Sequence, residues 1–107
     1  MRPIEFQILL TLAAGERHGY AIIQDIEGRS NGTITVETGT LYRALQRLLE
    51  GELVRATEPR GDTASDDERR RYYAITPAGK RAAADEARRM AALVDAARNA
   101  RLIPETT

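Results

Sequence analysis

Four segments with helical periodicity, three short and one long, constrain this chain of 107 residues more than any other feature. Apolar side chains recur every three or four positions in residues 3–14, 19–28, 38–50 and 77–101. Prolines, glycines and capping residues mark the ends of these segments. A chain of this size forms one ordinary domain with a modest core, so we expect the helices to pack together rather than to stand apart.

Two strand-like runs, Leu53–Glu58 and Arg70–Ile75, lie between the third and fourth helices. The polar stretch that joins them predicts a β-hairpin with a long tip. Alternation along the second strand places Tyr73 on the core side. Residues 33–36 predict a further short strand or an extended link. This order predicts a mainly α fold with a β-hairpin wing, a winged helix-turn-helix over residues 1–76, and a C-terminal dimerisation helix and tail over 77–107.

Local signals also predict how three helices begin. Thr38 is the expected N-cap of the third helix, and Thr76 is the expected N-cap of the fourth, with Pro77 at its first position. His18 is interpreted as a local turn or helix-start residue, because a histidine acting as a general base would need a partner that is not identifiable here.

Composition excludes several classes of function. The chain has no cysteine and one histidine, which excludes disulfides, thiolate sites and multi-histidine metal sites. No catalytic triad spacing or phosphate-cradling loop occurs, so we predict no enzyme, no cofactor and no metal. The absence of cysteine fits a reducing compartment, and we expect a cytoplasmic protein. No apolar run approaches the roughly 20 residues of a membrane span.

The third helix has the two faces that a DNA-reading helix needs. Leucines 41, 45 and 48 anchor one face, and Gly39 near the N-terminus lets a phosphate approach the backbone. The guanidinium group of Arg43 has the shape to donate two hydrogen bonds to the edge of a guanine base. The residues of this helix predicted to contact DNA are Thr38, Gly39, Thr40, Tyr42, Arg43 and Arg47. The alternative is an ordinary surface helix with a solvated charged face.

The predicted wing has mixed charge. Arg60, Arg69 and Arg70 provide cations for the DNA backbone or a narrow minor groove. Acidic residues, Asp62 and Asp66 among them, lie in the same loop and would repel phosphate or pair with the arginines. With 16 basic and 16 acidic residues the formal net charge is zero, so any attraction to DNA must be local. A DNA-contacting wing and a solvated loop whose charges cancel both remain open.

The fourth helix has heptad spacing along one side. A helix of about 25 residues cannot bury such a stripe on so small a domain, so a second copy of the chain is the expected partner. The alternative is a helix folded back on its own domain. Two-fold symmetry would place two recognition helices about 34 Å apart on DNA. The predicted interface comprises Ala83, Ala87, Met90, Leu93, Val94 and Ala97.

Three segments resemble the PadR family of transcriptional regulators, in its order and spacing. They are ILLTLAAGERHGYAIIQDIE (8–27), ETGTLYRALQRLLEGELV (37–54) and RRYYAITPAGKR (70–81), about half of the chain. The single short C-terminal helix is similar to that of the smaller subgroup. The resemblance implies a homodimer that binds a pseudo-palindromic DNA operator, usually as a repressor, and often a small-molecule effector that relieves repression. It also implies that Tyr20 meets a phosphate.

Two other functions stay open at this stage. A winged-helix module that binds protein instead of DNA would fit the zero net charge and the acidic wing. A small enzyme would need a catalytic constellation that the sequence does not contain. Some relatives bind flat aromatic drugs between tryptophans, and this chain has no tryptophan.

Overall fold

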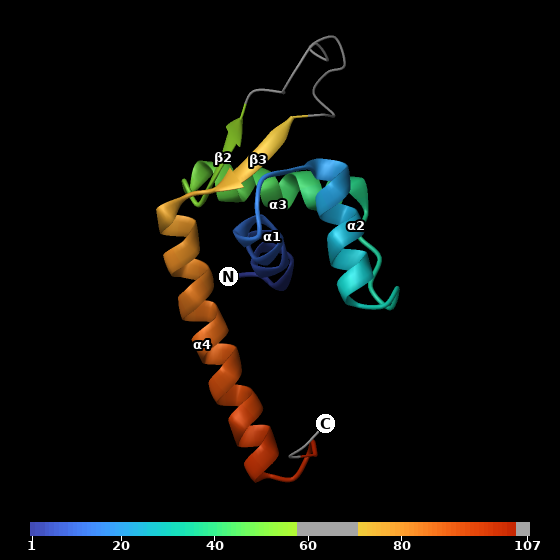
Figure 1. Ribbon diagram of the computed structural model, residues 1–107, viewed down its shortest axis with the longest axis vertical. Helices are drawn as coiled ribbons and strands as arrows, with labels where there is room; N and C mark the ends of the chain where they lie inside the picture. Colours follow the sequence, from blue (N-terminus) through green and yellow to red (C-terminus); the bar gives the residue numbers. More distant parts are fainter. Residues whose placement is uncertain (58–70, 105–107) are drawn as a thin grey trace.

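The computed structural model describes residues 1–57 and 71–104 of the chain. Three short helices and a small sheet form a head, and one long helix projects from it (Figure 1). The elements are α1 (Pro3–Ala13), β1 (Arg17–His18), α2 (Gly19–Arg29), α3 (Thr38–Glu50), β2 (Val54–Thr57), β3 (Tyr72–Ile75) and α4 (Pro77–Asn99). The predicted mainly α fold with a winged helix-turn-helix is therefore confirmed.

The sheet differs from the prediction in one strand. Its order is β1-β3-β2 and both pairings are antiparallel. β1 was not predicted, because two residues are too few to show any periodicity. It pairs with the wing strand β3, in the register Arg17 to Tyr73 and His18 to Tyr72.

The link between α2 and α3 is extended but joins no ladder. Side chains at the end of α2 satisfy the backbone N–H groups of the link instead. The hydroxyl of Ser30, the C-cap of α2, accepts from Ile34 N–H at 3.0 Å, and the Glu27 carboxylate accepts from Val36 N–H at 2.8 Å. Because these donors already have partners, the link needs no strand neighbour. The N-cap of α3 is Glu37, so the prediction of Thr38 as the cap was wrong by one residue.

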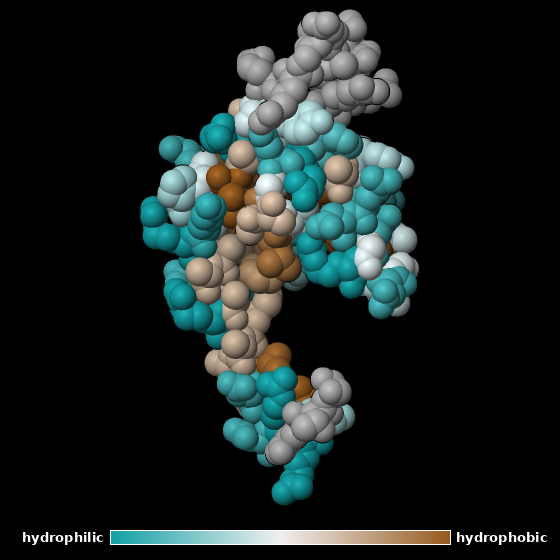
Figure 2. Space-filling model, viewed as in Figure 1, coloured by the Kyte–Doolittle hydropathy of each residue, from teal (hydrophilic) through white to brown (hydrophobic). Residues whose placement is uncertain are grey.

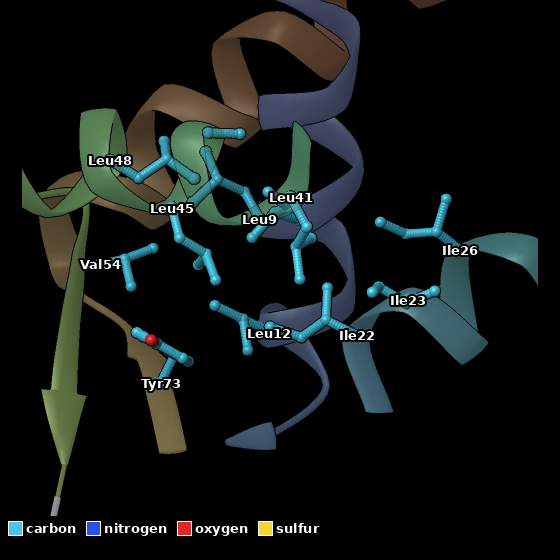
Figure 3. Packing of buried hydrophobic residues seen from close by; sticks show 12 residues of the cluster. Leu9, Leu12, Ile22, Ile23, Ile26, Leu41, Leu45, Leu48, Val54 and Tyr73 are labelled. Carbon is cyan, nitrogen blue, oxygen red and sulfur yellow. The ribbon is translucent and has the colours of Figure 1, made fainter. Parts of the chain in front are cut away.

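The core lies where α1 meets the other elements. α1 contacts α2, α3, α4 and β3. Figure 3 shows Leu9 and Leu12 of α1 among leucines of α3 and isoleucines of α2, with Val54 and Tyr73 of the wing strands at one side. Tyr73 is buried, as its place on the alternating strand predicted. One apolar core therefore joins the three helices to the wing.

The start of α4 is held tightly against the head. Thr76 is its N-cap, as predicted: its hydroxyl accepts from Gly79 N–H at 3.0 Å and donates to the Glu52 carbonyl at 2.7 Å. Gly79 is buried, and a Cβ on it would lie 2.1 Å from the Leu53 carbonyl oxygen. The backbones approach so closely that only glycine fits, and this contact sets the angle at which α4 leaves the head. Within the described ranges, no helix is both long and apolar enough to cross a membrane.

We expect Gly79→Ala to lower the free energy of unfolding by about 2 kcal/mol or more, because the added methyl group meets backbone rather than a movable side chain. Urea or thermal unfolding measures this. Gly28→Ala is the matched control, since a Cβ on that helical glycine meets nothing within 4 Å. It should be neutral or stabilising by up to about 1 kcal/mol. Equal effects of the two changes would contradict the assignment.

Candidate nucleic-acid interface

One face of α3 is buried in the core, and the opposite face is exposed. Leu41, Ala44, Leu45 and Leu48 are buried in the core, whereas Thr38, Gly39 and Arg43 are exposed. Thr40, Tyr42 and Arg47 are half-buried at the boundary. The core therefore fixes the orientation of the helix without covering its outer face. This is the two-sided arrangement that the leucine spacing predicted.

Arg43 lies along the first turns of α3. Its Nη2 is 3.4 Å from the Thr40 hydroxyl, to which it donates. A Cβ on Gly39 would be 3.2 Å from Nη1, so the absence of a side chain there lets the guanidinium lie close to the helix. The exposed residues Thr38, Gly39 and Arg43, together with the half-buried Thr40, form one patch, called here the α3 polar face.

The N-terminus of α3 opens onto the same patch. No described side chain caps it, and Glu37 makes no capping hydrogen bond. The first N–H groups of an uncapped helix have no partner inside the helix, and the helix dipole adds partial positive charge there. The α3 polar face thus combines a guanidinium, two hydroxyl groups and open backbone donors, which suits an anion such as a phosphate.

Tyr42 joins α3 to the start of α2. A Cβ on Gly19 would lie 2.2 Å from the Tyr42 hydroxyl oxygen, so the tyrosine rests directly on the glycine backbone. His18 caps α2, as interpreted from sequence: its Nδ1 accepts from Ala21 N–H at 3.1 Å. Tyr20 follows at once and is 62% exposed. The HGY motif therefore places Tyr20 on the surface and Tyr42 against the neighbouring helix.

Arg47 is held within the protein, unlike Arg43. Its Nε donates to the Glu5 carboxylate at 2.6 Å, which ties α3 to α1. Arg2 N–H donates to the other oxygen of Glu5 at 3.1 Å. Burial raises the pKa of Glu5, but the hydrogen bonds and positive charges of Arg47 and Arg2 outweigh that effect, so this pKa lies below its ordinary value. The predicted DNA contact at Arg47 thus falls on a side chain with a structural partner.

We expect Glu5→Gln to lower the free energy of unfolding by about 1 kcal/mol at pH 7. A carboxylate with a lowered folded-state pKa stabilises the fold above its unfolded pKa, near 4.5, and loses this effect as the pH falls through the folded value. The difference from the original chain should therefore shrink as the pH is lowered from 7 to 3 in urea unfolding.

Glu50→Gln is the control for this measurement. Glu50 is exposed and accepts a hydrogen bond from the neutral amide of Gln46 at 3.2 Å. Its replacement should change stability by less than about 0.5 kcal/mol at either pH. A Glu5→Gln penalty that persists unchanged at pH 3 would show that the ion pair is not its cause.

The structure describes the predicted interface residues of α4 but not three of the predicted wing residues. Arg60, Arg69 and Arg70 fall outside the described residues. On α4, Ala83 packs against the core, whereas Ala87, Met90, Leu93 and Val94 are exposed and Ala97 is half-buried. α4 does not fold back on its own head beyond its first turns (Figure 1). Its predicted interface residues form a continuous apolar stripe with little cover.

The head has the architecture of a winged helix-turn-helix, the class that reads DNA with its third helix. The model of the transcriptional regulator PadR-like family matches residues 8–85. The chain therefore belongs to this family. Since its members are transcriptional regulators, the prediction that the protein is not an enzyme is confirmed, as is the resemblance noted in the sequence.

Solved structures share the fold. A transcriptional regulator from Clostridium thermocellum superposes with a TM-score of 0.76 over 90% of this chain and 87% of that one, at 24% identity. PadR of Bacillus subtilis, in complex with operator DNA, superposes with a TM-score of 0.66 over 78% of this chain and 46% of that one, at 21% identity.

A curated relative matches in sequence. Uncharacterized protein X of Lysinibacillus sphaericus is 39% identical over 69 residues, which are 64% of this chain. The chain spans 61% of the length of that relative.

Proposed function

We propose that this regulator is a cytoplasmic homodimeric repressor that binds a pseudo-palindromic operator in double-stranded DNA. The observation that carries the proposal is the α3 polar face: an uncapped helix N-terminus, with Thr40 and Arg43 beside it, on a helix whose other face is buried. Each part has a role in this function. The helix enters the major groove, Arg43 reads a base edge, and the open N–H groups and Tyr20 contact phosphates.

A solved structure of this fold supports DNA binding. The Bacillus subtilis PadR structure contains operator DNA, and its fold is the one described above. Since the net charge of this chain is zero, its attraction to DNA depends on local groups rather than on an overall positive field. Binding should still weaken as salt rises, in proportion to the number of phosphates that the dimer contacts.

The apolar stripe of α4 supports the homodimer. Leu93 is 71% exposed and Val94 is 40% exposed, on a helix that continues well beyond the head. Figure 2 shows apolar side chains gathered along the side of α4 that borders the hollow below the head. A contiguous exposed apolar surface of this kind marks a protein–protein interface. A two-fold pair of such helices covers both stripes and presents two copies of α3 to neighbouring half-sites.

We further propose that the dimer represses by occupying its operator and excluding other proteins. A small-molecule effector binding in a cavity at the dimer interface would change the spacing of the two heads and release the DNA. Because the chain has no tryptophan, such a ligand would be held by aliphatic side chains and Met90 rather than between indole rings.

Arg43→Ala should weaken operator binding about 10- to 100-fold, the loss of one good bidentate base contact. Fluorescence anisotropy with the DNA upstream of the chain's own gene measures this. Arg88→Ala is the matched control, because Arg88 is exposed and pairs with Asp85 on the opposite side of α4 from the stripe. Arg43→Ala binding as well as the control would remove α3 as the reading helix, and no DNA binding at all would favour a protein-binding module.

Val94→Asp should convert the dimer to a monomer, since it places two charges in an apolar interface. Sedimentation equilibrium at tens of micromolar distinguishes the two states. Ala92→Asp adds the same charge on the opposite side of the helix and should leave the dimer intact. A monomeric original chain at this concentration would contradict the proposed interface.

A further inference from the structure

Glu27, in the last turn of α2, holds the link to α3 at two points. Its carbonyl oxygen accepts from Gly32 N–H at 3.0 Å and from the Ser30 hydroxyl at 2.9 Å. Its carboxylate reaches nine residues along the chain and accepts from Val36 N–H at 2.8 Å. One half-buried residue therefore holds both the reversal that ends α2 and the residue that precedes Glu37, the N-cap of α3.

The chain reverses after α2 through two consecutive residues in the left-handed region. Asn31 has φ 56° and Gly32 has φ 80°. Asn31 N–H donates to the Gly28 carbonyl at 3.1 Å, and together with the bond from Gly32 to Glu27 this is the Schellman form of helix ending. Asparagine and glycine adopt this conformation at low cost, so local sequence explains the reversal. It does not explain where α3 then begins.

The first turn of α3 is placed by the link rather than by the core. The buried side chains of the helix begin at Leu41, whereas residues 38–40 are exposed or half-buried. The core thus fixes the helix from its second turn onward. In the link, Val36 packs its side chain against the core and donates its N–H to Glu27. This hydrogen bond and this contact together locate the start of α3.

The hydrogen bond from Val36 to Glu27 leaves the start of α3 open. Val36 precedes the N-cap, so its N–H is not one of the first donors of the helix. An acidic side chain that capped α3 itself would occupy an N–H group that a phosphate needs. Glu27 instead holds this end of the helix from one residue outside it.

We propose that Glu27 is a positioning residue for DNA reading, which acts through Val36 on the first turns of α3 and so on Arg43. The proposed function places Tyr20 of α2 on a phosphate and Arg43 on a base edge. The hydrogen bond of Glu27 sets α3 against α2 and therefore fixes the offset between these two contacts. Binding groups need placement to within about 0.5 Å, which supporting hydrogen bonds provide. This inference rests on the proposed operator binding and adds a residue that acts without touching DNA.

The charge of Glu27 and its hydrogen bond have opposite effects on DNA binding, which separates positioning from simple electrostatics. A carboxylate repels phosphates, so removal of the charge alone would strengthen binding. Loss of the hydrogen bond alone would misplace α3 and weaken binding. Glu27→Gln removes the charge and keeps an acceptor oxygen at the same reach. Glu27→Asp keeps the charge and withdraws the carboxylate by one methylene group.

Fluorescence anisotropy with the DNA upstream of the chain's own gene, and with random DNA of equal length, measures both changes. Glu27→Asp should lower operator affinity about tenfold, the effect of losing one charge-assisted hydrogen bond. Its affinity for random DNA should change less than about threefold, because non-specific binding depends on phosphate contacts. Glu27→Gln should stay within about threefold of the original chain on both DNAs. Glu50→Asp, the same shortening of an exposed acid at the other end of α3, is the matched control and should change neither.

Three outcomes would overturn the inference and leave the proposed function standing. They are operator binding by Glu27→Asp as tight as by Glu50→Asp, binding by Glu27→Gln as weak as by Glu27→Asp, and an equal loss on operator and random DNA. Circular dichroism before each titration establishes that the variants are folded. If the original chain binds the upstream DNA no more tightly than random DNA, the inference and the proposed function fail together.

Hydrogen exchange of the Val36 amide tests the bond without relying on Glu27→Asp. Exchange should be slowed to the same degree in the original chain and in Glu27→Gln, because both supply an acceptor oxygen. An unprotected Val36 amide in the original chain would remove the hydrogen bond and the positioning role with it.

Discussion

Burial of α1 is the interaction on which the rest of the structure depends. Its residues Ile8, Leu9 and Leu12 are almost fully buried, and the helix contacts α2, α3, α4 and β3. Each of these elements is short or has one long exposed side, so none would be stable without this shared core. α3, the wing strands and the projecting helix α4 therefore keep their mutual arrangement only as long as α1 stays in place.

Two glycines allow the close contacts that fix the angles between helices around this shared core. Gly19 lets the Tyr42 hydroxyl rest on the start of α2, and Gly79 lets the start of α4 rest on the Leu53 carbonyl. The first contact sets α3 against α2, and the second sets α4 against the head. An error in the angle at which α4 leaves the head grows along a helix of about 34 Å, so close backbone packing at its origin fixes where the end of the helix lies.

The two arginines of α3 differ in whether their side chains are paired within the fold or exposed. Arg47 pairs with Glu5 and holds α3 on α1, whereas Arg43 lies one turn earlier, on the exposed side next to Thr40. Both have the same chemistry, and the chain as a whole has no net charge. One guanidinium is therefore used to pack α3 on α1, and the other is exposed to solvent at the start of the helix.

The sequence by itself determined the helix spans, the wing strands, the buried side of α3, the exposure of Arg43 and the cap at Thr76. These features depend on periodicity and on neighbours a few residues away, which a single chain displays directly. The tertiary structure alone decided that β1 pairs with β3, that Arg47 meets Glu5 and that Tyr42 rests on Gly19. These contacts join residues far apart in the chain, and their geometry depends on how whole elements pack, which no local pattern records.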